Sequence, residues 1–485
     1  MSDRTLRQET VSSMIWNAIQ RFGTMLLSFV SNLVLARLLL PEDFGCIGML
    51  TIFIALSQTF IDGGFGAALI QKQNTTQKDY STIFYWNLFV SLLFFIIMLV
   101  AAPSIADFYD MPSLCNVLRG MSFVLLINGF LVIQTTILTK KLAFKILAKI
   151  NLIGTFVGVV ISIIAAYFGM GVWSLVIKTV ITSVVTGILL WTLNSWRPSL
   201  QFSWSSFKSL FNFGGLMLLS SLLNTIFENL QGLVIGKVYT AKDLGYYTQA
   251  RKIDEIPSWS ITQIVTQVSF PVFSKISDNL GSLKNAVKKS VVCTNFLTFP
   301  LQVLLIVLAE PIIKILFTDK WIESVVYFRI LSVYSMFVAL NAINNNVIKA
   351  VGKGNTFFWL QLSKKVLGIL LLFLGFNFGV IGVTWSVSIS GISWWVMTAV
   401  VNRKIIHYGL WEQCKDIFPS VGISVLVGAI IMFANSIIAL APLANILFSS
   451  IIFVILYCLL SRIFNFRPLF VYRDIFVERL SSKRK

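Results

Sequence analysis

The stretch NAIQRFGTMLLSFVS, residues 17–31, is mostly apolar but carries a regular row of polar side chains. The members of this row are Asn17, Arg21, Thr24, Ser28 and Ser31. Because they are spaced by three or four residues, a helix would place them all on one face. A second apolar stretch repeats the row 200 positions later, with Ser221, Asn224, Glu228 and Gln231. A polar face has no solvent in lipid hydrocarbon, so two matching rows predict two equivalent helices that line a shared, hydrated interior.

The composition places the whole chain in a membrane. Hydrophobic residues make up 56% of the 485 residues and charged residues only 12%, which excludes a single water-soluble core. One crossing of a bilayer core of ~30 Å takes roughly 20 helical residues, and about fourteen stretches qualify. They centre on residues 13–36, 44–65, 80–101, 114–138, 147–168, 172–193, 213–234, 256–273, 287–308, 325–347, 356–376, 381–401, 418–438 and 444–464. We therefore predict an all-α, polytopic membrane protein.

The placement of lysine and arginine predicts the orientation of the chain. Cytoplasmic loops keep an excess of positive residues, and most of these bases share one side if the amino terminus, with Arg4 and Arg7, is cytoplasmic. The basic carboxyl tail falls on the same side, with Arg462, Arg467, Arg473, Arg479, Lys483, Arg484 and Lys485. We therefore predict that both termini are cytoplasmic. The formal charge of +19 then reflects topology and attraction to membrane lipids, and no nucleic acid is expected because the bases are scattered over short loops.

Cysteine and histidine usage argues against a metal centre or a disulfide frame. The five cysteines are odd in number and widely separated, at Cys46, Cys115, Cys293, Cys414 and Cys458. His407 stands alone in a predicted loop. We expect neither a metal nor a cofactor.

The segment after the first predicted helix recurs after the seventh. At the same offset, matching residues are Arg37 and Lys237, Asp43 and Asp243, and Gly45 and Gly245. A second pair of segments is Gly171-Val172-Trp173 and Gly382-Val383-Thr384-Trp385. We predict two six-helix lobes, residues 1–200 and 201–405, followed by a terminal helix pair with a basic tail, residues 406–485. Both lobes begin on the same side, so a pseudo-two-fold axis along the membrane normal should relate them around a central substrate cavity.

Several motifs of this chain occur in a known order and spacing. They include LARLLLPEDFGCIG (residues 35–48), Asp62-Gly63-Gly64-Phe65-Gly66, IGKVYTAKDLGYYTQA (residues 235–250) and Phe270-Pro271-Val272-Phe273-Ser274. Together they resemble the bacterial polysaccharide flippases of the Wzx and WzxC kind, in the multidrug, oligosaccharidyl-lipid and polysaccharide exporter superfamily. The likeness runs to about Val401. The chain departs from the family at Gln231, where an acidic residue is common, and Glu228 one turn earlier is the carboxylate available for ion coupling.

The resemblance implies a function. A flippase of this kind moves an oligosaccharide linked to undecaprenyl pyrophosphate, a polyprenyl carrier, from the cytoplasmic to the outer leaflet of the bacterial inner membrane. This step serves O-antigen, capsule or exopolysaccharide assembly and proceeds by alternating access of the two lobes. The resemblance further implies a monomeric transporter rather than an enzyme, with polysaccharide polymerase or assembly proteins as partners.

Four bases fall inside the predicted spans and are candidates to contact the dianionic pyrophosphate. They are Arg21, Lys178, Lys364 and Lys365. Lys178 shares a helix face with Ser174, Thr182 and Thr186. The expected polar lining of the cavity is Asn17, Thr24, Ser28, Ser31, Asn224, Glu228 and Gln231. Each base alone could instead reach back to the membrane interface, and each polar row could instead hydrogen-bond between packed helices.

Other charged and aromatic residues suggest a gate. Arg251, Lys252, Asp254 and Glu255 precede Pro257, and the helix that we expect after them places this group at the outer mouth. It could open and close by exchanging salt bridges, or it could be a solvated helix start with internal pairing. Tyr246 and Tyr247 beside it are candidates for sugar contact. Asp62, before two glycines, is expected to cap or hinge a helix.

Three alternatives stay open. A multidrug or cation antiporter of the same superfamily should carry more carboxylates than bases in its cavity. A flippase for peptidoglycan lipid precursors would differ only in its cargo. An integral-membrane polymerase or glycosyltransferase would need a sizeable extramembrane loop or an Asp-x-Asp metal pair, and this chain has neither.

Overall fold

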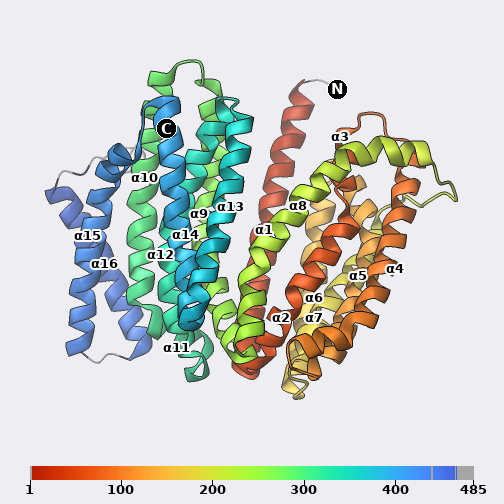
Figure 1. Ribbon diagram of the computed structural model, residues 1–485, viewed down its shortest axis with the longest axis horizontal. Helices are drawn as coiled ribbons and strands as arrows, with labels where there is room; N and C mark the ends of the chain where they lie inside the picture. The colour runs from red at the N-terminus through yellow and green to blue at the C-terminus, as the bar shows by residue number, and fades with distance from the viewer. Residues whose placement is uncertain (1–2, 439–440, 465, 467–485) are drawn as a thin grey trace. The chain divides into compact units, whose positions relative to one another are not determined.

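The computed structural model describes residues 3–438, 441–464 and 466, with side chains from Ser12 onward. Every regular element in this part of the chain is a helix, which confirms the all-α class. The chain forms two compact units, Met1–Gly245 (unit 1) and Tyr246–Lys485 (unit 2) (Figure 1). The side chains of Arg4 and Arg7 lie outside the described residues. So do the tail residues Arg467, Arg473, Arg479, Lys483, Arg484 and Lys485.

Unit 1 contains seven long helices, the short helix α3 and the first turn of α9. The bounds are α1 Asp3–Leu38, α2 Pro41–Asp62, α3 Phe65–Gln71, α4 Gln77–Phe108, α5 Ser113–Lys140, α6 Phe144–Tyr167, α7 Trp173–Leu193 and α8 Trp204–Val238. Helix α6 packs on α1 and α7, and α4 packs on α5. Helix α8 packs on α2, α3 and α4, so unit 1 includes a helix that the sequence assigned to the second lobe. The predicted lobe boundaries stay a prediction.

Unit 2 contains the rest of α9 and the helices that follow it. The bounds are α9 Ala241–Lys275, α10 Leu280–Val307, α11 Ala309–Phe317, α12 Ser324–Ala350, α13 Gly354–Gly375, α14 Gly379–Ile406, α15 Leu410–Ile437 and α16 Pro442–Ile463, with short 3-10 turns at Asp319–Trp321 and Phe376–Phe378. Helix α12 packs on α10 and α14. The terminal pair joins the unit because α15 packs on α10, with Val303, Val427 and Phe453 in their shared apolar cluster.

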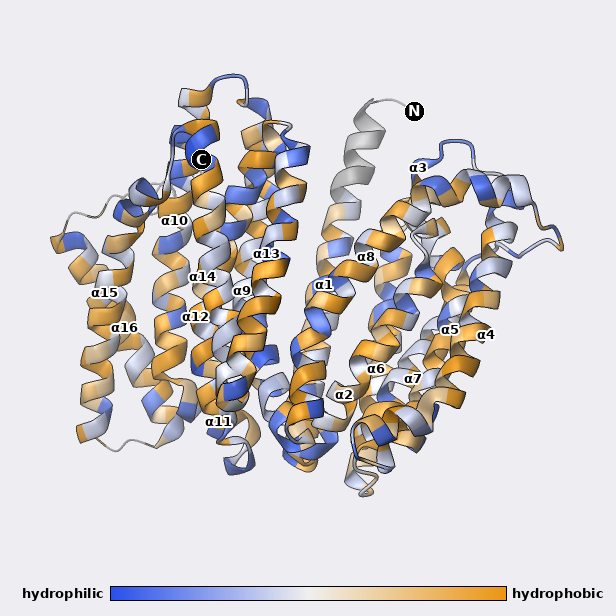
Figure 2. Ribbon diagram, in the orientation of Figure 1, coloured by the Kyte–Doolittle hydropathy of each residue, from blue (hydrophilic) through white to orange (hydrophobic). Residues whose placement is uncertain are grey.

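Each of the fourteen predicted spans falls on a long helix of the described chain. Among the described residues, twelve segments are long and apolar enough to cross a membrane, and one of them, Gly354–Ile406, contains both α13 and α14. The fourteenth helix, α9, is outside this set and has a mean hydropathy lowered by its charged residues. Figure 2 shows hydrophobic residues along most helices and hydrophilic residues gathered at the helix ends and loops. The protein is therefore a multipass membrane protein.

The sequence repeat has a structural explanation at the starts of α2 and α9. Asp43 accepts a hydrogen bond from the Leu40 backbone N–H at 2.9 Å, and Asp243 accepts one from Thr240 at 3.2 Å. Both aspartates therefore cap the first turn of a helix. A β-carbon on Gly45 would lie 1.7 Å from the Ala241 carbonyl oxygen, and one on Gly245 would lie 1.9 Å from the Pro41 carbonyl oxygen. Equivalent residues thus make equivalent contacts, as a two-fold relation requires.

The span Pro41–Gln71 is broken between α2 and α3. Gly63 and Gly64 have φ values of 55° and 69°. This left-handed backbone conformation is one that residues other than glycine rarely adopt. The Gly63 N–H donates to Thr59 O and ends α2. The two glycines therefore break the helix directly after Asp62. We call this break the hinge, and movement about it stays a prediction.

Candidate functional site

The polar row on α1 is turned away from the helix that packs on it. Gly23 lies against Leu152 of α6, and Arg21 points about 200° around the helix from Gly23. The row comprises the exposed Asn17 and Ser28, the half-buried Arg21 and Thr24, and the buried Ser31. The Thr24 hydroxyl donates to the Gln20 carbonyl oxygen at 2.8 Å, within α1 itself. Helix α6 therefore leaves most of the row uncovered, as a cavity lining requires.

The row on α8 lies beside the contact of α8 with α2. Ser221, Asn224 and Glu228 are exposed and Gln231 is half-buried. The contact itself is marked by Thr225, whose hydroxyl is 3.0 Å from the Thr59 hydroxyl of α2. Sequence reasoning missed Thr225 because the matching residue of α1 is Met25, so the threonine falls outside the repeated row.

Lys178 is half-buried on α7, and two of its predicted polar companions serve helix packing. The hydroxyl of Thr182 lies at Gly158 of α6, and the hydroxyl of Thr186 lies at Gly154. Small residues at such spacing let two helices approach closely in a membrane. The alternative interpretation of polar stripes, as contacts between packed helices, is therefore correct for these two threonines.

Lys364 is held deep inside unit 2. The residue is 4% exposed, and its ammonium group donates to the Asn345 side-chain oxygen of α12 at 3.2 Å. Trp394 of α14 donates its indole N–H to the Lys364 backbone oxygen at 3.0 Å. None of the ion pairs in the described part of the chain involves Lys364. Lys365 is half-buried and points about 100° away, so the two lysines do not form one group.

Four asparagines of α12, which the sequence prediction did not include, each contact a different neighbouring helix. Asn341 donates to the Gly391 backbone oxygen of α14 at 3.1 Å, and Asn346 donates to Ser269 of α9 at 2.8 Å. Asn344 donates to Gln413 of α15, also at 3.1 Å. Asn345 faces α13, where it accepts from Lys364. The signal was present as NAINNN, residues 341–346, inside a predicted span.

The residues of the predicted outer gate lie on α9 within unit 2, and only part of the group is buried. Arg251 pairs with Glu255 one turn away at 2.7 Å, which is the internal pairing that the sequence left as an alternative. Asp254 is buried and accepts a hydrogen bond from Ser335 of α12, whereas Lys252 is exposed. The predicted location at a helix start was wrong, because α9 begins at Ala241 and runs through Pro257. Arg251 therefore lies about 15 Å along the helix.

The two tyrosines proposed for sugar contact are core residues. Tyr246 and Tyr247 are 7% and 1% exposed. The Tyr246 ring meets Trp321 edge to face, with ring centroids 6.0 Å apart. An aromatic ring that stacks on a sugar needs an accessible face, so this structure does not present them for that role.

Unit 1 contains an acidic pocket beside the hinge of α2. Its volume is about 440 Å³, and α2, α3 and α5 line it. Asn128 of α5 donates to the Gln58 side-chain oxygen at 2.8 Å, and Gln58 donates to the Asp62 carboxylate at 3.3 Å. The remaining lining residues are Gly64, Gly66, Ala67, Leu131, Val132, Thr135 and Thr136. Asp62 is therefore the one charged residue in the lining of this pocket.

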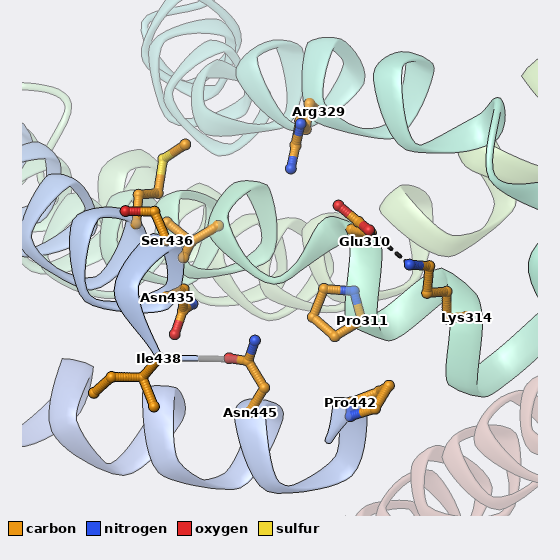
Figure 3. Close-up of a pocket in the computed structure, with 11 residues that line it drawn as sticks. Glu310, Pro311, Lys314, Arg329, Asn435, Ser436, Ile438, Pro442 and Asn445 are labelled. Atoms are coloured by element: carbon orange, nitrogen blue, oxygen red, sulfur yellow. Dashed lines mark hydrogen bonds and ion pairs between the residues drawn. The ribbon is translucent and has the colours of Figure 1, made fainter. Parts of the chain in front are cut away.

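Unit 2 contains a smaller pocket of about 330 Å³ where α11 and α12 meet α15 and α16. Figure 3 shows Glu310 flanked by Lys314 and Arg329, with Asn435 and Asn445 toward α15 and α16. Glu310 and Lys314 are 2.8 Å apart. The hydrogen bond from Lys314 lowers the pKa of the Glu310 carboxyl and raises the pKa of the Lys314 ammonium. None of the four predicted cargo bases lines either pocket: Arg21, Lys178, Lys364 and Lys365.

These features define a multipass helical membrane protein that carries charged and polar side chains within its spans. Residues 34–326 match the family model described as "Polysaccharide biosynthesis protein". The chain belongs to this family. The match covers most of unit 1 and the first helices of unit 2, including the repeated residues Asp43 and Asp243.

Curated relatives agree with this membership. The chain is 27% identical to the teichuronic acid biosynthesis protein TuaB of Bacillus subtilis (strain 168), over 86% of each chain. It is 24% identical to the lipopolysaccharide biosynthesis protein WzxC of Escherichia coli (strain K12), over 78% of each chain. The predicted resemblance to Wzx and WzxC proteins is confirmed.

A solved structure supports the fold. The lipid II flippase MurJ in an inward closed conformation superposes with a TM-score of 0.77, covering 96% of this chain and 100% of that chain. The sequence identity is 16%, so this likeness shows a shared helical architecture.

Proposed function

We propose that this protein is a flippase that moves a polyprenyl-pyrophosphate-linked oligosaccharide from the cytoplasmic to the outer leaflet of a bacterial inner membrane. Membership of the polysaccharide biosynthesis protein family supports this function, as does the likeness to TuaB and WzxC, which are named for teichuronic acid and lipopolysaccharide biosynthesis. Transport rather than catalysis is the role that follows.

The chemistry of such a cargo requires both polar side chains and bases inside the membrane. Each sugar hydroxyl moved into hydrocarbon without a partner costs on the order of a few kcal/mol. The polar rows on α1 and α8 supply hydrogen-bonding side chains for these hydroxyls. The pyrophosphate is a dianion that basic side chains stabilise, while the lipid tail can stay in the bilayer.

The burial of the Lys364 ammonium group within a span is the observation that supports this function most strongly. A lysine ammonium buried in a span, bonded to an amide oxygen and in no ion pair of the described chain, is suited to an anion that arrives with the cargo. Arg21, Lys178 and Lys365 are the further bases that we assign to the pyrophosphate, and Glu228 is the carboxylate that we assign to ion coupling. Arg251, Lys252, Asp254 and Glu255 remain candidates for a gate, which would lie within α9 and not at its start.

With both termini in the cytoplasm, export proceeds by alternating access of two lobes around a central cavity. The membrane potential, negative inside, favours outward movement of an anion by about 2.3 kcal/mol per charge at 100 mV. This bias adds to any ion coupling.

The proposal is tested by leaflet translocation in proteoliposomes. A short glycan linked to undecaprenyl pyrophosphate, a peptidoglycan lipid precursor and an organic cation are compared as cargo. We expect rapid movement of the glycan lipid only in vesicles that contain the protein. Faster movement of the peptidoglycan precursor would assign the protein to that cargo instead, and transport of the organic cation alone would assign it to the drug antiporters.

A further inference from the structure

The Asp62 carboxylate stands where electrostatics favours a positive charge. Asp62 is the last residue of α2, and no basic residue lies in the last turn of that helix. The carbonyl groups at a helix C-terminus carry a partial negative charge, so a carboxylate there adds to it and a cation is attracted. None of the ion pairs in the described part of the chain includes Asp62.

A short chain of amides ends at this carboxylate and leaves oxygen acceptors in the pocket lining. Asn128 uses its N–H group to donate to Gln58, and Gln58 uses its own N–H group to donate to Asp62. These two bonds leave the second carboxylate oxygen of Asp62 and the side-chain oxygen of Asn128 as acceptors. Thr135, whose side chain carries a hydroxyl oxygen, is also among the lining residues. Oxygen ligands of this kind suit hard cations.

The pocket fits a hydrated cation better than an anion. Asp62 is its one charged lining residue, so the net charge of the lining is negative. A volume of about 440 Å³ has room for an ion together with several water molecules, each of which occupies ≈ 30 Å³ in the liquid. Irregular backbone within a membrane span is tolerated where it lines a hydrated cavity, and the Gly63-Gly64 hinge adjoins this pocket.

We propose that Asp62, with Asn128 and Thr135, binds a hydrated monovalent metal cation such as Na⁺ at the hinge between α2 and α3. The bound ion neutralises the carboxylate and stabilises the bent arrangement of the two helices. The site lies wholly within unit 1 and is independent of the cargo that the protein carries.

The test measures thermal unfolding of the purified full-length protein in detergent, at constant ionic strength, in NaCl and in choline chloride. We expect 100 mM Na⁺ to raise the unfolding midpoint by at least about 2 °C. Asp62→Asn, which keeps the shape of the side chain, should abolish this shift. Asn128→Ala should raise the Na⁺ concentration that gives half the shift at least about tenfold.

The matched control is Asp107→Asn, which removes an exposed aspartate from the last turn of α4, away from the pocket. This variant should respond to Na⁺ as the native protein does. Equal midpoints of the native protein in NaCl and choline chloride would overturn the proposal, as would a full Na⁺ shift in Asp62→Asn. A midpoint that depends on pH through Asp62 but ignores Na⁺, K⁺ and Li⁺ would also overturn it, because a proton would then neutralise the carboxylate.

Discussion

Asp62 in unit 1 and Lys364 in unit 2 are both charged residues within candidate membrane spans, but their surroundings differ. Asp62 ends a helix at two left-handed glycines and is exposed to a pocket. Lys364 lies inside the continuous helix α13, is 4% exposed and contacts an asparagine of the preceding helix α12. A charge can thus be accommodated by interrupting the backbone and admitting solvent, or by surrounding the side chain with amides.

This difference has a mechanistic consequence. A solvent-accessible carboxylate can exchange a small ion without rearrangement of its neighbours. A buried lysine can bind an anion only when the helices around it separate, because the ammonium group is otherwise enclosed. We therefore assign binding of a small cation to the hinge region of unit 1, and we expect Lys364 to contact the cargo only after the helices around it separate.

The largest expected effect on stability comes from a substitution at the break between α2 and α3. Gly64→Ala forces a β-carbon into the left-handed region and toward the Gly214 carbonyl oxygen, which would be 2.3 Å away. We expect a loss of unfolding free energy of about 2–4 kcal/mol, measured by chemical denaturation. The control Gly422→Ala lies in α15, where a β-carbon meets nothing within 4 Å, and should leave stability equal or slightly higher. Unchanged stability in Gly64→Ala would show that the hinge is not required.

Replacing the buried base should separate transport from stability. Lys364→Met removes the charge and keeps the length of the side chain, so we expect at least about a tenfold loss of translocation rate. Stability should not fall, since a buried base is exchanged for an apolar group. The matched change is Lys353→Met at the exposed start of α13, which should leave the rate unaltered. Normal translocation by Lys364→Met would remove this lysine from the cargo site.

The dependence of Lys364 on its amide partner gives an intermediate effect. Asn345→Leu should destabilise the native protein by about 1–3 kcal/mol, because the ammonium group loses its acceptor. The same substitution in a Lys364→Met background should cost at least about 1 kcal/mol less. Denaturation of the four proteins in this cycle measures the difference. Additive effects would mean that the 3.2 Å contact between these residues contributes nothing.

The smallest effect is expected at the Glu310–Lys314 pair, which is outside the candidate spans. Because Lys314 lowers the pKa of the Glu310 carboxyl, the pair stabilises the folded state above the ordinary carboxyl pKa and loses this contribution as the pH falls through the lowered value. The unfolding midpoint of the native protein should therefore fall slightly more between pH 6 and pH 3 than that of Glu310→Gln. Identical pH profiles would indicate that the exposed pair is energetically neutral.

Much of the fold could be predicted because hydropathy reports membrane spans directly. All fourteen long helices of the described chain were expected, whereas the short helices α3 and α11 were not. The repeated Asp43 and Asp243 have a local capping role that a short motif encodes. The start of α9 was not predictable, since its charged residues and Pro257 obscure a helix that tertiary contacts sustain. The helix that each polar face contacts also depends on packing. The contacts of Thr225 and of the α12 asparagines were therefore not predicted from the sequence.

The central claim is that bases within the spans recognise the pyrophosphate of the cargo. Binding of undecaprenyl pyrophosphate and undecaprenyl monophosphate to the protein in nanodiscs tests it most directly, with native protein beside a variant carrying Arg21→Gln, Lys178→Gln, Lys364→Gln and Lys365→Gln. We predict at least about a tenfold preference of the native protein for the pyrophosphate lipid, and no preference in the variant. A variant that folds and keeps the native preference would contradict the account.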